Sequence, residues 1–316
     1  DVNEYAKKKK GISEFKSSLS EFILKSSNEK PLVFIIDELD RCRPNYAVSI
    51  LEQIKHFFSI SNIVFVISID KIQLGHAIRG VYGSDLIDAE EYLKRFIDIE
   101  YTIPDPEINN FYNYLYDYFE YDKFFSSNER RKYGELSNEG KVFLEICRIL
   151  FSASSVSLRK QEKIFSHARL ALESFQKDEY VVPVVYLFLN YIKIVHEDLY
   201  IELKEKKLTV LEFQKKFLSI VKANLKEENE NRLMWLEALL IIYYGNYFEG
   251  KKNRNNYYVQ NSTTNKLMPV IHSVINPAKD EDFGSIFQGI DRSGNIGWLN
   301  LEYFINKIEL LENLKR

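Results

Sequence analysis

The chain has 316 residues, which is more than one typical hydrophobic core needs and predicts at least two domains. Its 43 basic and 46 acidic residues are interspersed and leave a net charge of only −3, so the composition gives no sign of a nucleic-acid-binding groove. The two cysteines, Cys42 and Cys147, fit neither a disulfide framework nor a zinc knuckle and favour a reducing cytosol.

The first predicted element is an amphipathic helix that follows the Lys7–Lys10 run and ends near Asn28, with Ser13 available as its N-cap. Its apolar residues recur at helical spacing: Ile12, Phe15, Leu19, Phe22 and Ile23. The lysine run is interpreted as a solvated start, or as a basic cluster attracted to anionic lipid if a membrane segment precedes it.

A strand, a helix and a second strand follow. Residues 32–36 are continuously apolar and lead into Asp37, which predicts a strand buried on both faces of a parallel sheet. A helical pattern after Pro44 and a second apolar run at 63–69 complete a right-handed βαβ unit.

The rest of the α/β region is expected to be helical and extended in alternation. Its predicted elements are a helix from Asp70 to about Arg79, a glycine-rich turn at 80–83, a helix at 88–96 and an extended segment at 97–103. Two prolines stop this region, so we place its boundary at residue 106.

From residue 108 onward the pattern is mainly helical, with predicted helices at 157–175, 183–197, 209–226, 231–246 and 299–313. The most apolar stretches, 181–195 and 233–244, are short and interrupted by polar residues, so they predict buried helices and not membrane spans. Residues 250–265 are polar and are expected to form a mobile loop. The predicted domains are therefore 1–106, 107–250 and 251–316.

Chemistry is concentrated where the first strand ends. A buried parallel strand followed by Asp37 and Glu38 is the Walker B arrangement, in which a carboxylate on rigid backbone holds Mg²⁺ beside nucleotide phosphates, often through water. Asp37 is the candidate for that role, and Glu38 is the candidate general base for the attacking water. The alternative is an ordinary solvated strand end.

Several blocks in fixed order resemble the KAP family of P-loop NTPases over about residues 12–106. These blocks are Phe34-Ile35-Ile36-Asp37-Glu38-Leu39-Asp40-Arg41-Cys42-Arg43-Pro44, then 51–55, 64–71, 73–74, 77–78, 82–83, 88–95 and Pro104. The resemblance implies a P-loop NTPase-type parallel sheet core, incomplete at its N-terminus, followed by a mostly α-helical region. It also implies ATP and Mg²⁺ as ligands.

The resemblance suggests further nucleotide contacts. Ser68 or Asp70 would be the polar sensor beside Walker B, although Asp70 is equally well explained as a helix N-cap. Arg95 matches a basic residue that reaches the nucleotide, with an exposed Lys-Arg pair as the alternative. Arg159 is similar to an arginine of the lid, and Arg41 is a candidate within the Walker B block. A basic residue in a first helical turn, such as Arg159, opposes the macrodipole, which favours a role outside the helix.

The chain departs from the family pattern in one respect. No Gly-x-x-x-x-Gly-Lys-Ser/Thr loop is present, and Gly11 is the sole glycine before Asp37. We expect either that the phosphate-binding loop lies upstream of this sequence, as the Asp37-Glu38 pair favours, or that nucleotide binding was lost. A membrane link is expected only through such an upstream segment, on the cytoplasmic side, and this chain alone is expected to be inactive.

The functional expectation is an ATP hydrolase that couples its nucleotide state to a signalling or defence-type switch through self-association and a protein partner of the helical region. The alternative is a nucleotide-independent scaffold on a degenerate ATPase core. A weaker pattern places Asp291, Ser293, Asn295 and Glu302 at EF-hand-like spacing, but Ile296 replaces the glycine of the turn, which argues against a calcium site.

Overall fold

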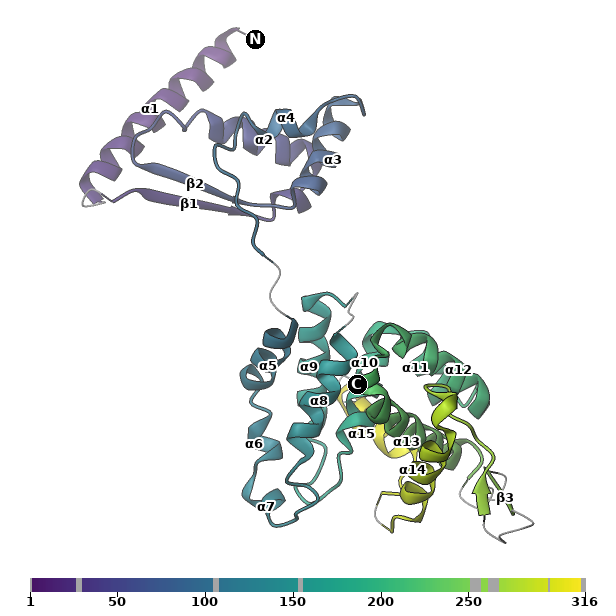
Figure 1. Cartoon of the computed structure of the whole chain (residues 1–316). Coiled ribbons are helices and arrows are strands. Elements are labelled where there is room, and N and C mark those ends of the chain that lie inside the picture. The colour runs from purple at the N-terminus through teal and green to yellow at the C-terminus, as the bar shows by residue number, and fades with distance from the viewer. Residues whose placement is uncertain are drawn as a thin grey trace. The chain divides into compact units, whose positions relative to one another are not determined.

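The computed structural model describes residues 2–26, 30–104, 108–152, 156–250, 257–260, 267–294 and 296–313 (Figure 1). It divides into two compact units, Asp1–Pro104 and Asp105–Arg316, which we take in turn as the N-terminal unit and the helical unit.

The N-terminal unit contains two strands and several helices. In chain order they are α1 (Val2–Ser26), β1 (Leu32–Asp37), the 3₁₀ helix η1 (Leu39–Arg41), α2 (Pro44–Lys55), β2 (Ile63–Ser68), α3 (Lys71–Tyr82) and α4 (Ala89–Leu93). The strands pair in parallel, with Leu32 opposite Ile63 and Asp37 opposite Ser68. The predicted βαβ unit is therefore confirmed.

Three local predictions were wrong. Helix α1 begins at Val2, so Ser13 lies inside the helix instead of capping it, because the lysine-rich residues before it are good helix formers. Helix α3 continues through Gly80 and ends where Gly83 adopts a left-handed conformation with φ 68°. Helix α4 ends at Leu93, before the predicted residue 96.

The two faces of the β1–β2 pair differ. On one face Ile36, Phe65 and Ile67 pack against a core supplied mainly by α2, α3 and α4, which lie on this side of the strands (Figure 1). The other face carries four exposed apolar side chains, which we call the open face: Val33 (50% exposed), Ile35 (72%), Val64 (45%) and Val66 (44%). The prediction that β1 is buried on both faces was therefore wrong, because no described helix of this unit covers the open face.

The helical unit begins with α5 and contains one short hairpin. Its helices are α5 (Ile108–Tyr118), α6 (Asp122–Phe125), α7 (Asn128–Arg131), α8 (Glu139–Phe151), α9 (Leu158–Leu172), α10 (Pro183–Val195), α11 (Glu197–Lys204), α12 (Val210–Val221), α13 (Glu230–Phe248), α14 (Asp280–Arg292) and α15 (Leu301–Asn313). Strands β3 (Tyr258–Gln260) and β4 (Leu267–Pro269) pair antiparallel, and η2 (Lys222–Asn224), η3 (Glu227–Asn229) and η5 (Pro277–Lys279) are 3₁₀ helices.

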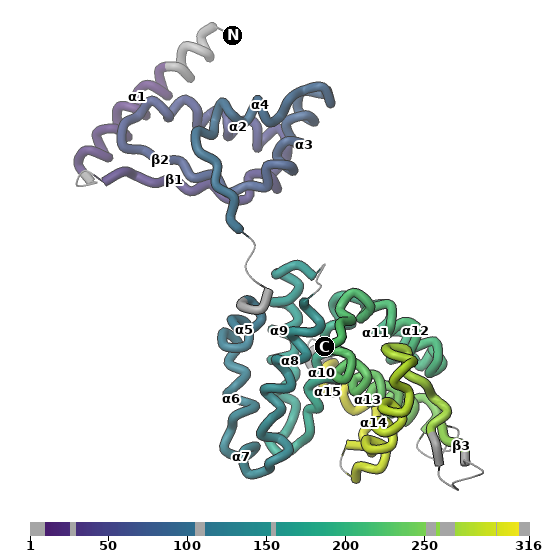
Figure 2. The backbone as a smooth tube through the Cα atoms, viewed as in Figure 1, coloured from purple at the N-terminus to yellow at the C-terminus, as the bar shows by residue number. Residues whose placement is uncertain are grey.

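Two helices form the centre of this unit. In α10 every residue from Pro183 to Ile192 is buried, and α10 packs against α8, α9, α13 and α15 (Figure 2). In α13 the residues 233–234 and 236–246 are buried. Helices that are apolar on all sides belong in the core of a large helical domain. No helix among the described residues is long and apolar enough to cross a membrane.

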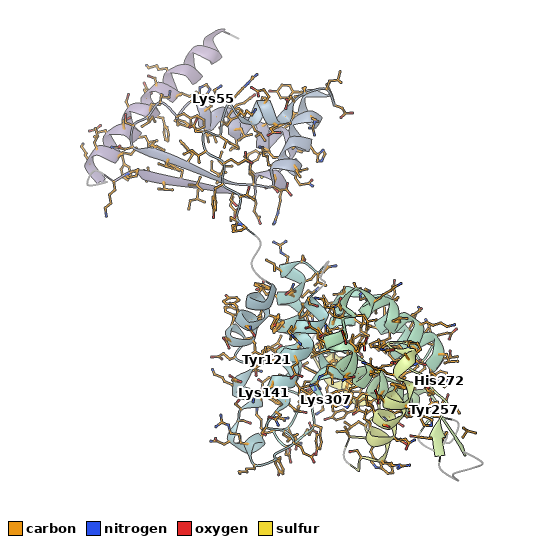
Figure 3. The ribbon with its side chains drawn as sticks, viewed as in Figure 1. Lys55, Tyr121, Lys141, Tyr257, His272 and Lys307 are labelled. Atoms are coloured by element: carbon orange, nitrogen blue, oxygen red, sulfur yellow. The ribbon has the colours of Figure 1, made fainter. Side chains whose placement is uncertain are left out.

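Several buried polar groups in the helical unit have specific hydrogen-bond partners. Tyr121, labelled in Figure 3, is fully buried and donates a hydrogen bond to the carbonyl of Phe165 at 2.7 Å. Glu237 in α13 accepts hydrogen bonds from Gln214, from the Ser273 hydroxyl and from the Val274 amide. The predicted loop at 250–265 falls mostly outside the described residues, but 258–260 form β3.

Candidate functional site

Asp37 is the last residue of β1, at the carboxyl end of the parallel pair, and its side chain is exposed. One carboxylate oxygen accepts a hydrogen bond from the amide of Glu38 at 2.8 Å. Asp37 lies in register with Ser68. On the open face, Asp37 comes after Ile35 along β1, and Ser68 comes after Val66 along β2. The strand pairing therefore places a carboxylate and a hydroxyl side by side at one edge of the sheet.

Glu38 has an unusual backbone conformation, with φ 57° and ψ 27° in the left-handed region. Residues other than glycine adopt this region rarely, and such strain is concentrated at functional sites. The turn is held by the Arg41 amide, which donates to the Glu38 carbonyl at 3.0 Å. The Arg41 guanidinium also forms an ion pair with the Glu38 carboxylate, and both side chains are about half exposed. One oxygen of the Glu38 carboxylate is thus paired with Arg41.

Asp70 acts as the N-cap of α3. One of its carboxylate oxygens accepts hydrogen bonds from the amides of Ile72 at 2.9 Å and Gln73 at 3.0 Å. An acidic N-cap satisfies the free amides at a helix start and complements the helix dipole. The structure therefore bears out the N-cap interpretation of Asp70, while its proposed contact with nucleotide stays a prediction.

Arg95 and Arg159, the two remaining arginine candidates, are far from Asp37 in the sequence. Arg95 follows α4, is exposed, and its guanidinium lies over the ring of Tyr92 at 5.7 Å. Arg159 is the second residue of α9, where Ser157 is the N-cap, and it belongs to the helical unit. The structure thus brings together Asp37, Glu38, Arg41 and Ser68, whereas the roles of Arg95 and Arg159 stay predictions.

Lys71 is a residue that the sequence reasoning missed. Its ammonium group forms ion pairs with Glu100 at 2.8 Å and Glu90 at 3.2 Å, and these bonds, with Glu100 the stronger influence, raise the pKa of Lys71. Lys71 therefore ties the start of α3 to α4 and to the segment after it. The sequence feature that could have drawn attention to Lys71 is its position directly after the N-cap Asp70.

The metal-binding potential of the site follows from its donors. Among the residues that the structure describes, no group of three or more His, Cys, Asp or Glu side chains is assembled for a metal ion. Magnesium in nucleotide sites is commonly held by one or two carboxylates together with phosphate oxygens. Asp37 alone, with one oxygen outside its bond to Glu38, fits that requirement.

The EF-hand-like spacing lies in a helix–loop–helix, since α14 and α15 flank it. The carboxylate of Asp291 accepts a hydrogen bond from the Tyr258 hydroxyl at 2.8 Å. Asn295 lies outside the described residues. Nothing in the described part of the loop adds to the case for calcium.

A βαβ unit with an Asp-Glu pair at the carboxyl end of its first strand is compatible with a P-loop type of nucleotide-binding core. Comparison with family models gives a more specific result: the KAP family P-loop domain matches residues 2–276. The chain belongs to this family, and the match confirms the resemblance and extends it into the helical unit. No curated protein and no solved structure matches the chain.

Proposed function

We propose that this chain supplies the magnesium-binding and water-activating half of an ATP hydrolysis site. The observation that carries the proposal is the edge where Asp37, Glu38 and Ser68 meet, with Glu38 in a strained turn. The proposed reaction is attack of water on the γ-phosphorus of ATP, which releases ADP and phosphate.

Each residue at this edge has a proposed role. Asp37 holds Mg²⁺ through water, and Mg²⁺ supplies charge neutralisation on the β- and γ-phosphates. Glu38 accepts the proton of the attacking water on the oxygen that its ion pair with Arg41 leaves free. Arg41 is a proposed contact of a phosphate oxygen. Ser68 is the polar sensor beside Asp37.

Three further residues are proposed contacts of the nucleotide. Asp70, Arg95 and Arg159 are all exposed, which is compatible with a ligand-facing role. Arg95 would neutralise charge on the transferred phosphoryl group, acting within its own subunit or on a neighbouring one. Arg159 would act from a lid formed by the helical unit. Asp70 already caps α3, so its contact would use the oxygen that the cap leaves free.

In this proposal the phosphate-binding loop is supplied by a segment outside these 316 residues, and the open face supports this part of the proposal. A phosphate-binding loop joins a buried strand to a helix. The open face continues directly into Asp37 and Ser68, so a strand–loop–helix segment that covered Val33 and Ile35 would also lie against the carboxylate. Parallel sheets are stable with both faces covered, which such a segment would achieve.

The helical unit is proposed to act as lid and effector of a cytoplasmic signalling or defence-type switch, with self-association and a protein partner. Two observations support this. Tyr114 and Tyr118 on α5 are exposed and stacked, with ring centroids 5.6 Å apart, and exposed aromatic side chains are enriched at protein interfaces. Cys42 and Cys147 are both free thiols, which suits a reducing compartment.

The test measures Mg-ATP binding and phosphate release by this chain and by the complete product of its gene. In the complete product Glu38→Gln should abolish turnover and retain ATP binding, because the base is lost while Asp37 remains. Asp85→Asn, which changes an exposed carboxylate in the turn after α3, is the matched control and should leave turnover unchanged.

The second candidate is a nucleotide-independent scaffold built on an ATPase core. The absence of a phosphate-binding loop from the sequence favours it, because the phosphates then have no cradle of backbone amides. If the complete gene product neither binds nor hydrolyses ATP, the scaffold replaces the ATPase.

A further inference from the structure

A groove in the surface of the helical unit is lined by none of the residues assigned to the nucleotide site. It has a volume of about 770 Å³ and is bounded by α8, η3, α13 and α14. A second hollow, of about 570 Å³, lies over Lys226, Glu227 and Glu228, and Glu228 borders both hollows. We call the two hollows together the Trp235 groove, after the aromatic side chain in its wall. Because they share a border, the space is elongated, which fits a polypeptide segment better than a compact metabolite.

Trp235 gives the groove its main apolar surface. Within residues 233–246 of α13 every other side chain is buried, so the half-buried Trp235 is where this core helix reaches solvent. Ile149 of α8, which is buried, and Ile286 of α14, which is half-buried, also line the groove. Tryptophan side chains in such grooves contribute a large share of the binding energy at many protein interfaces. The groove therefore has the composition of a protein-binding surface.

Contacts with Arg232 support the position of Trp235. The Arg232 guanidinium lies 5.2 Å from the centre of the Trp235 ring and also forms an ion pair with Glu145 of α8. These contacts link α8 to α13, and the charges of Arg232 and Glu145 offset each other. A side chain that is held in place before binding loses less conformational entropy when a partner arrives.

The remaining charges differ between the two ends of the groove. Arg148, exposed on α8, forms no side-chain hydrogen bond or ion pair with another described residue. At the η3 end, the carboxylates of Glu227 and Glu228 outnumber the single ammonium group of Lys226. The α8 end is therefore positive and the η3 end negative. A helix complements both ends when an acidic residue precedes its apolar residues and a basic residue follows them, which is also the order that the helix dipole favours.

We propose that the Trp235 groove binds a helical segment of a partner protein, in which an apolar side chain that packs on Trp235 lies between an acidic residue facing Arg148 and a basic residue facing Glu228. The inference rests on one part of the proposed function, the protein partner of the helical unit, and specifies its chemistry. Binding is measured without ATP, so its failure and a failure of the proposed ATPase are separate results.

The probe is an alanine-rich helical peptide of about 15 residues that carries Glu, Phe and Lys in this order on one face. The 316-residue chain has two tryptophans, so its two indole N–H resonances report on the groove, through Trp235, and on a position outside its lining, through Trp298. The Trp298→Phe variant assigns the two signals. As peptide is added, the Trp235 resonance should shift to saturation while that of Trp298 stays unchanged. The absence of a saturable Trp235 shift, or equal shifts of both resonances, overturns the proposal.

A cycle of variants tests the pairing with Arg148. Replacing the Glu of the peptide by Gln should weaken its binding to the unchanged chain about 3–5-fold, as expected for an ion pair at the rim of a groove, and should have no effect on binding to Arg148→Gln. Arg131→Gln, which removes an exposed arginine of α7, is the matched control and should keep the preference for Glu. Equal affinities of both peptides for the unchanged chain, or a preference that survives in Arg148→Gln, overturns the proposal. Glu228→Gln and the Lys of the peptide form the same cycle at the other end.

A dilution series of the chain without peptide tests the competing occupant, a second copy of this chain. The expected result is a Trp235 resonance that does not change with protein concentration, since the groove then stays open to the partner. If the resonance shifts on dilution, and sedimentation shows dissociation over the same concentration range, a second copy occupies the groove and the proposal is overturned.

Discussion

The two units of this chain bury their apolar residues to very different extents. Among the described residues the main core of the N-terminal unit consists of ten buried side chains supplied largely by α2, α3 and α4, while the apolar side chains of the open face stay in contact with solvent. In the helical unit α10 and most of α13 are buried on all sides. The N-terminal unit, which carries the candidate site, thus leaves one face of its strand pair exposed.

This difference has a physical meaning for function. Parallel strands occur almost always with both faces covered, so the open face is where the proposed further segment would pack. The helical unit encloses its own core and also holds buried charges such as Arg130 in place. We therefore expect the two units to respond differently to comparable substitutions.

The largest expected effect is in the helical unit. Arg130→Met leaves Glu139 buried without its cationic partner and should lower the free energy of unfolding of this unit by about 3–5 kcal/mol. Chemical denaturation followed by circular dichroism measures it. The double variant Arg130→Met with Glu139→Gln should recover part of the loss, because it removes the uncompensated charge. Equal losses in the single and double variants would contradict this account.

The next effect concerns the small core of the N-terminal unit. Leu51 is completely buried, so Leu51→Ala should cost about 2–4 kcal/mol from lost burial and the cavity left behind. Calorimetry should show two transitions, with Leu51→Ala lowering one and Arg130→Met lowering the other.

Leu86→Ala is the control for Leu51→Ala, since Leu86 lies in the same unit and is 96% exposed, and it should change neither transition. If Leu51→Ala shifted both transitions equally, the two units would unfold together and the comparison would fail.

The sequence predicted the type and order of the secondary-structure elements better than the residues at which they begin and end. The apolar runs before Asp37 and at 63–69 identified both strands because short apolar runs rich in β-branched residues favour strand over helix. The start of α1 was missed, since Ser13 looks like an N-cap although the preceding residues also favour helix. The domain boundaries at 106 and 250 stay predictions.

The candidate site was only partly accessible to sequence reasoning. The Asp-Glu pair after a strand was a readable pattern, and strand register then placed Ser68 beside Asp37. The left-handed backbone of Glu38 could not be foreseen, because that conformation is rare for glutamate. The ion pairs of Lys71 with Glu90 and Glu100 could not be predicted either, because they join residues far apart in the sequence.

A smaller effect tests Asp70, where structure and proposed function overlap. Asp70→Ala removes the N-cap of α3 and should cost about 1 kcal/mol in the N-terminal unit, while Asp70→Asn keeps a capping oxygen and should cost a few tenths. Thermal denaturation measures both. If the complete gene product hydrolyses ATP and Asp70→Asn leaves turnover unchanged, Asp70 is a cap and has no contact with the nucleotide.

The smallest expected effect is the one that bears most directly on the open face. Ile35 is 72% exposed, so Ile35→Thr, which retains β-branching, should change the stability of this chain by less than about 0.5 kcal/mol. Ile67→Thr, on the covered face of β2, should cost more than about 1 kcal/mol because it places a hydroxyl against the core. The same Ile35→Thr in the complete gene product discriminates between the two proposed functions. A cost there that matches Ile67→Thr means that a further segment covers the face beside Asp37, as the ATPase requires, whereas an unchanged stability leaves the face exposed and favours the scaffold.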